Sequence, residues 1–420
     1  MTRRPPPGID ASVPVVVLKM VRDHYAHGRL AVARSLGRLG VSVYCLHESR
    51  LSPAAWSRYG HHVTWPIDDT PSPGVVDDLL RVGDDVGGRP VLVATDDVST
   101  LFVDEHADAL CDGFRYPHQP SGLALELADK GRLSGLCGRH GVPEPEAVFP
   151  RSRGDVEDYL TRGGALPVVV KSMDPLTLRR RPEAASVAIA RTPAALLDLY
   201  DRSEVPDAPN LMLQEYIPGG PETVWMFNGY FDADSECLVS FTGRKIRQHP
   251  PGTGATTLGI CEPNDEIEAT TRRFLKAIGY RGIVDMGYRY DARDGQYKLL
   301  DVNPRLGASF RLFVGEGGMD VVRAMYLDLT GQPVPATPLR AGRRWLVEPF
   351  DVWTAREYVA DGSLTWSEWR RSLRGVDEAA WFALDDPAPF LAMVALFSAQ
   401  PLYRRLTRSR RIARGRSPLR

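Results

Sequence analysis

Short apolar runs alternate with helical patterns in the first third of the chain. The runs are rich in valine and cover residues 14–20, 41–47 and 90–95. Such runs are typical of parallel strands that are buried on both faces. A helical pattern over residues 28–40 follows the first run, and another over residues 99–110 follows the third. Strands alternating with helices predict a parallel α/β sheet over roughly residues 1–120.

Polar residues stand where the third of these runs ends. Thr95, Asp96 and Asp97 come directly after it. Ligands of open parallel sheets bind beyond the carboxyl ends of the strands, so these residues and the region after Met20 lie at a possible ligand edge. Asp96 also stands where the cap of the next helix belongs, and capping is the preferred interpretation.

The pattern changes between residues 121 and 330. A helix is predicted over residues 123–140, and short strands are expected near residues 167–172, 186–190 and 210–217. Residues 221–247 alternate as antiparallel strands do, and residues 266–278 form an amphipathic helical pattern. From residue 331 onward the sequence is rich in proline and tryptophan and less regular.

A predicted hairpin at residues 282–305 carries the most specific chemistry. Its first strand holds the lone carboxylate of Asp285, and its second strand ends with Asp301 and Asn303, which share one face. Carboxylate and amide oxygens on adjacent strands are suitable ligands for Mg²⁺. Arg305 follows as a permanently charged donor for a phosphoryl group. A plain hairpin with solvated polar ends is the alternative.

Two further strand ends carry polar residues. Lys171 closes a run of three valines, and a buried ammonium group calls for an anion such as phosphate. The strand over residues 211–217 contains Gln214 and Glu215 and runs into a Pro-Gly-Gly turn, whose backbone can bind a planar base. Glu222 is placed to accept hydrogen bonds from a ribose. Taken singly, Lys171 pairing with a surface acid and a solvated Glu222 explain these residues equally well.

In their order along the chain, these residues resemble the ATP-grasp superfamily, in the branch of carboxylate–amine ligases that includes the D-aspartate ligases. The resemblance covers about residues 120–330, with a weaker match over residues 1–120. It implies an N-terminal Rossmann-like α/β domain at residues 1–120. An ATP-grasp domain of mixed α/β structure would follow at residues 121–330, with a small lobe at about 165–217. The remainder, residues 331–420, would be a C-terminal extension.

The resemblance also implies roles for individual side chains. Lys130 and Lys171 would bind the phosphates of ATP. The hinge that binds adenine would contain Gln214, Glu215 and Ile217, and Glu222 would bind the ribose. The ligands of Mg²⁺ (or Mn²⁺) would be Asp285, Asp301 and Asn303. Arg305 would neutralise the transferred phosphoryl group, and Arg244 with Lys245 would form a basic motif near the active site.

Two positions depart from the usual pattern of the superfamily. The loop that normally covers the phosphates falls at residues 173–185, which contain no glycine but hold Arg179, Arg180 and Arg181. These arginines would clamp phosphates, bind an anionic substrate or form a solvated turn. Aspartate stands at 285 and 301, where the superfamily often has glutamate, and the shorter side chain still coordinates Mg²⁺.

The activity implied by the resemblance is ATP-dependent joining of a small carboxylate to an amine through an acyl phosphate. Carboxyl-phosphate chemistry, as in biotin carboxylases and carbamoyl-phosphate synthases, is one alternative, and a non-catalytic ATP-binding regulator is another. Arg244 and Arg311 are candidates for binding the substrate carboxylate, although either residue could support structure instead. His249 is a candidate base for the amine, but a loop histidine is more often plain polar surface.

Composition narrows the cellular setting. The net charge of −1 gives no reason to expect a nucleic-acid partner. The five cysteines include no CxxC pair, which argues against a zinc site and a disulfide framework. This pattern favours a protein of the reducing cytosol. The N-terminus is expected to be neither a signal peptide nor a membrane span, so a cytoplasmic enzyme is predicted. A homodimer is a possible assembly.

The C-terminal segment raises a separate question. Residues 389–397 are apolar but too short to cross a bilayer, and eight arginines follow within residues 404–420. An apolar helix beside a basic tail suits a weak contact between residues 389–420 and a membrane surface. A docked C-terminal helix with a disordered tail is the preferred interpretation.

Overall fold

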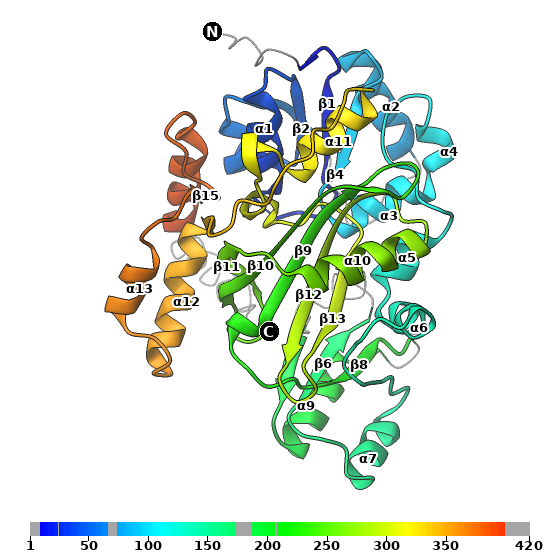
Figure 1. Cartoon of the computed structure of the whole chain (residues 1–420), viewed down its shortest axis with the longest axis vertical. Helices are drawn as coiled ribbons and strands as arrows, with labels where there is room; N and C mark the ends of the chain where they lie inside the picture. Colours follow the sequence, from blue (N-terminus) through cyan, green and yellow to red (C-terminus); the bar gives the residue numbers. More distant parts are fainter. Residues whose placement is uncertain (1–8, 24, 66–73, 174–186, 206–207, 400–420) are drawn as a thin grey trace, which may run out of the picture.

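The computed structural model describes residues 9–23, 25–65, 74–173, 187–205 and 208–399, and the elements that follow lie within them (Figure 1). The N-terminal sheet has four parallel strands in the order β3-β2-β1-β4. They are β1 (Val15–Leu18), β2 (Val43–His47), β3 (His61–Thr64) and β4 (Val91–Ala94). Its helices are α1 (Gly28–Gly37), η1 (Pro53–Trp56), α2 (Val75–Val86), α3 (Asp97–Glu105) and α4 (Ala107–Leu110). The predicted parallel α/β sheet is confirmed.

The all-apolar sequence of β1 follows from burial on both faces of this sheet. Val15 and Val17 enter one core with residues of α1, while Val16 and Leu18 enter another with residues of α2 and α3. Alternate residues of a strand point to opposite faces, so a strand covered by helices on both sides needs apolar side chains at every position.

A smaller antiparallel sheet forms around residues 147–215. Its strands, in the order β5-β8-β6-β7, are β5 (Ala147–Val148), β6 (Val168–Ser172), β7 (Val187–Ala190) and β8 (Leu211–Glu215). Helices α7 (Arg153–Thr161) and α9 (Pro193–Ser203) cover one face of it through Val156 and Leu196. Because side chains alternate along β6 and β8, Lys171 and Gln214 belong to the opposite face.

The helix predicted over residues 123–140 is two helices, α5 (Leu123–Ala128) and α6 (Lys130–His140). Asp129 breaks it with an extended backbone, and its carboxylate accepts a hydrogen bond of 2.8 Å from the backbone N–H of Arg132. Aspartate is a favoured N-cap because it satisfies a free amide of the first turn. The break places Lys130 at the first residue of α6.

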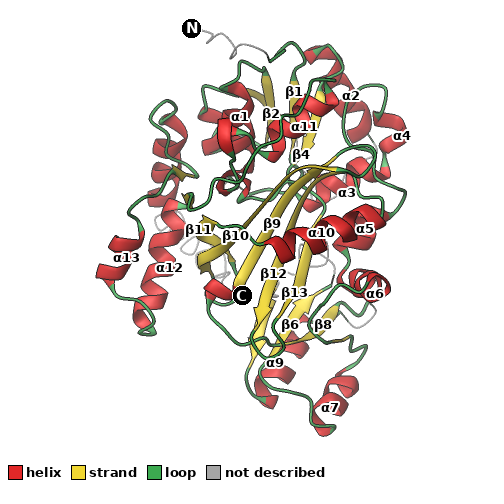
Figure 2. Ribbon diagram, in the orientation of Figure 1, coloured by secondary structure: helices red, strands yellow, loops and turns green. Residues whose placement is uncertain are grey.

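The largest sheet has seven strands in the order β13-β12-β9-β10-β11-β14-β15. They are β9 (Val224–Phe231), β10 (Cys237–His249), β11 (Ala255–Cys261), β12 (Gly282–Asp291), β13 (Gln296–Asn303), β14 (Arg344–Leu346) and β15 (Glu378–Ala379). Helices α5, α6 and α10 (Asp265–Ala277) cover one face, and α11 (Val321–Leu329) packs on the other (Figure 2). The short helices η2 (Pro221–Thr223), η3 (Phe310–Leu312) and η4 (Glu316–Gly318) lie in its connections.

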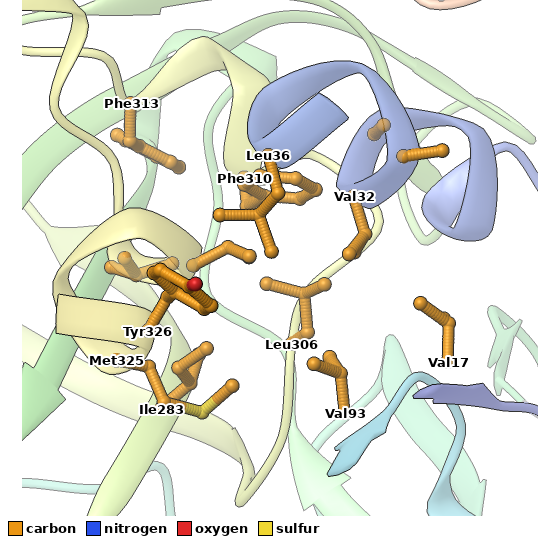
Figure 3. Packing of buried hydrophobic residues seen from close by; sticks show 14 of the residues in the cluster. Val17, Val32, Leu36, Val93, Ile283, Leu306, Phe310, Phe313, Met325 and Tyr326 are labelled. Atoms are coloured by element: carbon orange, nitrogen blue, oxygen red, sulfur yellow. The ribbon is translucent and has the colours of Figure 1, made fainter. Parts of the chain in front are cut away.

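A single apolar core joins the N-terminal sheet to the seven-stranded sheet (Figure 3). Val17 and Leu36 meet Ile283, Phe310 and Tyr326 in this cluster, and all five side chains are buried. Shared burial of this kind fixes the two sheets relative to each other, because separating them would expose large apolar surfaces to water.

The segment after residue 331 is part of this structure rather than an appendage. It supplies β14 and β15 to the edge of the seven-stranded sheet, followed along the flank by α12 (Glu348–Ala360) and α13 (Trp366–Ser372). Buried ion pairs hold it: Arg34 Nε lies 2.9 Å from Asp386 Oδ2, and Arg247 Nη2 lies 2.8 Å from Asp351 Oδ2. Among the described residues, none of the helices is long and apolar enough to cross a membrane.

Candidate functional site

A cavity of about 400 Å³ lies between the small sheet and the seven-stranded sheet. Ten of the residues implied by the resemblance line it together: Lys130, Lys171, Gln214, Glu215, Ile217, Lys245, Asp285, Asp301, Asn303 and Arg305. Arg244 and Glu222 are not among the lining residues. Residues separated by as many as 175 positions therefore meet in one place, from Lys130 to Arg305.

Two carboxylates and an amide converge on the wall formed by β12 and β13. Asp285 faces Asn303 in the strand pairing, and Asn303 Nδ2 lies 3.4 Å from both Asp285 Oδ2 and Asp301 Oδ2. Gly287 and Gly307 make room for the two aspartates, since a Cβ atom at either glycine would collide with a carboxylate. Burial, and then the neighbouring charge of Asp301, raise the pKa of Asp285 to about 6.

These residues fit a divalent cation. Two neighbouring carboxylates that repel each other gain from a positive ion between them, and the charge of Asp301 adds to burial in raising the pKa of Asp285. The described residues contain no group of three or more histidine, cysteine, aspartate or glutamate side chains suited to a metal. A set of two carboxylates and one amide suits Mg²⁺, which completes its shell with water and substrate phosphates.

Three lysines lie in the cavity lining. Lys171 is 7% exposed, its Nζ lies 3.3 Å from the carbonyl oxygen of Leu300, and burial lowers its pKa to about 8. Lys130 approaches from the start of α6. Lys245 of β10 donates a hydrogen bond of 2.7 Å to the carbonyl oxygen of Gly254, and burial lowers its pKa as well. These lysines form a positive region beside the carboxylates.

The basic motif on β10 divides between two faces of its sheet. Lys245 lines the cavity, whereas the neighbouring Arg244 pairs with Glu262, with 2.6 Å between Arg244 Nε and Glu262 Oε2. Successive side chains of a strand point to opposite faces, so Lys245 faces the cavity in this structure and Arg244 does not. The structure thus brings Lys245, and not Arg244, together with the other lining residues.

Arg305 forms an ion pair with Asp97, which belongs to helix α3 beside the N-terminal sheet. Its Nε lies 2.5 Å from Asp97 Oδ1 and its Nη2 lies 3.1 Å from Asp97 Oδ2, while Nη2 also donates to Asn303 Oδ1 at 3.3 Å. Asp97 is the first residue of α3, and Asp96 caps that helix by accepting from Ser99 N, as predicted. The two aspartates at the predicted ligand edge therefore have separate tasks.

Part of the cavity lining is apolar. Val169, Ile189, Ile217 and Leu300 contribute to it, as does the polar Gln214. Arg289, which the sequence did not single out, also lines the cavity, donates a hydrogen bond to the carbonyl oxygen of Gly219 and lies over the ring of Tyr216. Its position inside a strand of alternating residues was the signal that could have identified it.

Several other predicted residues are occupied by local contacts. Glu215 Oε1 lies 2.5 Å from Arg293 Nη2, and Glu222 Oε1 accepts from the backbone N–H of Gly220 at 3.1 Å. Arg311 is buried and pairs with Asp320 and Glu378, which is the structural role left open for it. His249 Nδ1 lies 3.8 Å from Glu357 Oε2, outside the cavity lining. The arginines at 179–181 and the tail after residue 399 lie outside the described residues.

A known ligase is similar to the chain over about two thirds of its length. No family model matches the chain. In sequence, it is 24% identical over 290 residues to the D-aspartate ligase of Enterococcus faecium (strain Aus0004), covering 66% of this chain and 68% of that relative. These values describe a distant relationship that spans most of both proteins.

Solved structures of the same fold come from other organisms. N5-carboxyaminoimidazole synthetase from Staphylococcus aureus, complexed with ADP, matches with a TM-score of 0.60 at 12% identity, over 80% of this chain and 82% of that one. An L-amino acid ligase from Bacillus licheniformis matches with a TM-score of 0.56 at 14% identity, over 76% of this chain and 75% of that one. The predicted resemblance and the predicted mixed α/β fold are both confirmed.

Proposed function

The chain has the ATP-grasp fold and is related to the ligases of that superfamily, and we propose that it is an ADP-forming carboxylate–amine ligase. The observation that carries the proposal is the meeting of Lys130 and Lys171 with Asp285, Asp301 and Arg305 in one cavity. Cations beside paired carboxylates are the arrangement that phosphoryl transfer from a magnesium nucleotide requires.

The proposed nucleotide donor is ATP, oriented by the apolar and the cationic side chains that line the cavity. An adenine ring fits between the apolar side chains of Val169, Ile217 and Leu300, with the backbone after Gln214 able to read its edge. The phosphates then extend toward Lys130 and Lys171. Glu222 remains the proposed ribose ligand, which requires it to give up its present bond to Gly220.

Asp285, Asp301 and Asn303 are the proposed ligands of Mg²⁺ or Mn²⁺. Bound there, the ion would neutralise phosphate charge and draw the β- and γ-phosphates into a fixed position. The chain's own part is to hold these three side chains on one wall, with the glycines at 287 and 307 leaving the space that the carboxylates occupy.

The proposed reaction has two steps. An oxygen of the substrate carboxylate attacks the γ-phosphorus of ATP, the bond to the bridging oxygen breaks, and ADP leaves with an acyl phosphate formed. The amine nitrogen then attacks the acyl carbon, the carbon–oxygen bond to phosphate breaks, and an amide and inorganic phosphate result as the amine loses its proton. Lys171, Lys245 and Arg305 stabilise the charge that moves between the oxygens.

The test is ADP release by the purified protein with ATP, Mg²⁺ and pairs of amino acids and small carboxylates, with the products weighed by mass spectrometry. A new amide mass that depends on both partners supports the proposal. ADP release that depends on bicarbonate instead would indicate carboxyl-phosphate chemistry. Tight ATP binding without ADP from any pair would indicate a regulator.

Arg244 remains the proposed ligand of the substrate carboxylate, although it now pairs with Glu262. Substitution of Arg244 by alanine tests this role directly. An increased KM for the carboxylate, with the KM for ATP unchanged, is expected if Arg244 turns into the site. A KM for the carboxylate that stays the same would remove Arg244 from the proposed site.

A further inference from the structure

His27, the N-cap residue of α1, lines the cavity although it is only 8% exposed. Its Nδ1 is enclosed and has no hydrogen-bond partner in the described part of the chain, whereas Nε2 is not among the enclosed atoms. Because the ring lines the cavity, Nε2 is the nitrogen that faces it. The fold therefore leaves one polar atom of this buried side chain open to a ligand.

The surroundings of the imidazole decide what Nε2 can offer. The rings of Trp345 and Trp381 lie 5.4 Å and 6.1 Å from it and are inclined edge to face. Aromatic faces carry negative charge density, so an enclosed Nδ1 is better placed among them with a proton than with a lone pair, and we assign the proton to Nδ1. Burial lowers the pKa of His27 to about 4, so the ring is neutral at pH 7. Nε2 of this neutral tautomer is a hydrogen-bond acceptor.

Gln248 of β10 supplies a second open acceptor. It lines the cavity and is 2% exposed. Neither atom of its amide is among the enclosed atoms, and neither has a hydrogen-bond partner within the residues that the structure describes, so the small exposed fraction lies at the amide. Buried amide groups are nearly always hydrogen-bonded, because leaving them unpaired is unfavourable. An unpaired amide that opens into a cavity indicates a ligand that pairs with it.

A series of direct contacts brings Gln248 and His27 to the same part of the cavity. Gln248 pairs with Thr256 across β10 and β11. A Cβ atom at Gly259 would lie 3.0 Å from Thr256 Cγ2, and Gly259 pairs with Trp345 across β11 and β14. Trp345, which also lines the cavity, is the residue whose ring contacts His27.

The same residues lie beside the proposed centre of phosphoryl transfer. Asp96 Oδ2 accepts a hydrogen bond of 2.8 Å from the backbone N–H of Met20, which ties the segment leading to His27 to the start of α3. The next residue, Asp97, pairs with Arg305. A second reactant must meet the acyl phosphate close to Arg305, so acceptors held here are in position to orient it.

We propose that His27 Nε2 and Gln248 Oε1 bind the nitrogen of the amine substrate, and that a primary amine is the class of nucleophile this chain takes. The inference rests on the proposed ligase function. A neutral primary amine has two N–H groups for the two acceptors and keeps its lone pair for the acyl carbon. Two neutral acceptors hold the free base, whereas a carboxylate in their place would favour the unreactive ammonium ion.

His27 also receives a proton in this arrangement. As the carbon–nitrogen bond forms, the carbon–oxygen bond to phosphate breaks and phosphate leaves with that electron pair. One proton passes from the nitrogen to His27 Nε2, and His27 then gives it to the departing phosphate. The amide is left neutral and the imidazole returns to its starting state.

The test separates the two steps of the reaction. Exchange of an oxygen isotope between the β,γ-bridge and the β-phosphate of ATP, with the carboxylate and without the amine, reports the first step, and amide formation reports both. The probes are the amino acid and small carboxylate that form an amide with the unchanged protein. His27→Phe should lower amide formation by about 100-fold or more while isotope exchange stays unchanged. His27→Gln keeps an acceptor but takes up no proton, so kcat should fall while the KM for the amine changes less than in His27→Phe.

Two further measurements address Gln248 and the class of amine. Gln248→Met should raise the KM for the amine by about tenfold or more, because one acceptor is lost. The same amine methylated at nitrogen should react at least about tenfold more slowly, since it has one N–H for two acceptors. Equal rates for the two amines would overturn the assignment of a primary amine. This comparison uses the unchanged protein, so it holds even if a variant fails to fold.

His249→Gln is the matched control, because His249 lies outside the cavity lining. Both readouts should stay as in the unchanged protein, and thermal unfolding of each variant checks that it is folded. Amide formation by His27→Phe at the unchanged rate would overturn the inference and leave the proposed function standing, and so would a loss of isotope exchange as large as the loss of amide. Absence of exchange in the unchanged protein with every carboxylate would overturn the proposed function, and this inference with it.

Discussion

Replacing Lys171 by methionine is expected to make the protein more stable and a poorer ATP binder at the same time. Lys171 closes a buried strand, and its Nζ donates a hydrogen bond of 3.3 Å to the carbonyl oxygen of Leu300. An ammonium group in such a place is costly without an anion beside it. Methionine has a similar length and carries no charge, so it fits the same space without that cost.

The magnitude follows from the pKa of the side chain. A fall from the ordinary value of 10.5 to about 8 corresponds to roughly 3 kcal/mol of folding free energy that keeps the buried group charged at neutral pH. The charge of Asp301 already offsets part of the burial. The substitution also removes the bond to Leu300, so a net gain of about 1–2 kcal/mol is expected.

The loss in binding has the opposite sign. A charged hydrogen bond to a phosphate contributes about 1.5–3 kcal/mol, which corresponds to an increase of about 10- to 100-fold in the Kd for ATP. Thermal unfolding without nucleotide measures the first effect, and titration calorimetry with magnesium and ATP measures the second. The matched control is Lys130→Met, because Lys130 is only partly buried. It should weaken ATP binding without raising the Tm.

A Lys171→Met protein with a lower Tm than the unchanged protein would refute the claim that burying the Lys171 ammonium group destabilises the fold. An unchanged Kd for ATP would refute the phosphate-binding role. The two results are independent, since the first concerns the empty protein and the second concerns the complex. If the Tm and the Kd for ATP both rise as expected, Lys171 lowers stability in order to bind ATP.

Three further substitutions test other parts of the structure. Asp97→Asn should lower kcat by about 10- to 100-fold with the Kd for ATP unchanged, because Arg305 loses the partner that orients it. Asp97→Glu should keep part of the rate. An unchanged kcat for Asp97→Asn would contradict the orienting role of Asp97. Asp301→Asn should raise the Mg²⁺ concentration for half-maximal ADP release by about tenfold or more, and excess Mg²⁺ should recover part of the activity; an unaltered Mg²⁺ requirement would exclude Asp301 as a ligand. Burial lowers the pKa of His27 to about 4, so the stability that depends on its neutral form should be present above about pH 6.5 and lost as the pH falls toward 4. Urea unfolding at pH 7 and pH 5 measures this, and His27→Gln should show a smaller pH dependence than the unchanged protein.

The placement of Asp301 and Asn303 on one face of a hairpin strand could be predicted from the sequence because it depends on local rules. The turn at residues 291–295 joins two strands, and Gly295 adopts a positive φ of 74° there. Strand alternation then places Asp301 and Asn303 on one face. The residue opposite each of them could not be predicted in this way, because the pairing shifts by one residue between Gly287 and Tyr288 and so brings Asp285 opposite Asn303.

The orientation of Arg244 and Lys245 could not be predicted in the same way. Alternation says that the two point to opposite faces, but not which face holds the cavity. The pairing of β10 with β11 also shifts between Lys245 and Arg247 and again before Gln248, so counting along the strand loses its phase. Which cation enters the site is decided by the position of the small sheet.

Contacts between distant segments were beyond local patterns altogether. Asp97 and Arg305 are 208 residues apart, and each has an ordinary local interpretation, one at a helix start and the other after a strand. Strands β14 and β15 are three and two residues long, which is too short to give a periodic signal in the proline-rich segment after residue 331. Their place in the sheet depends on tertiary packing.

The pairing of Arg34 with Asp386 has a consequence for how the protein is made. Helix α1 emerges early during synthesis, but the carboxylate that neutralises its buried arginine lies 352 residues later. Until that residue leaves the ribosome, closing the core around α1 would bury an uncompensated charge, which is strongly unfavourable. The N-terminal unit is thus expected to stay incomplete through most of translation, against the usual domain-by-domain order. Nascent chains that stop short of Asp386 would lack this closure and stay open to proteases.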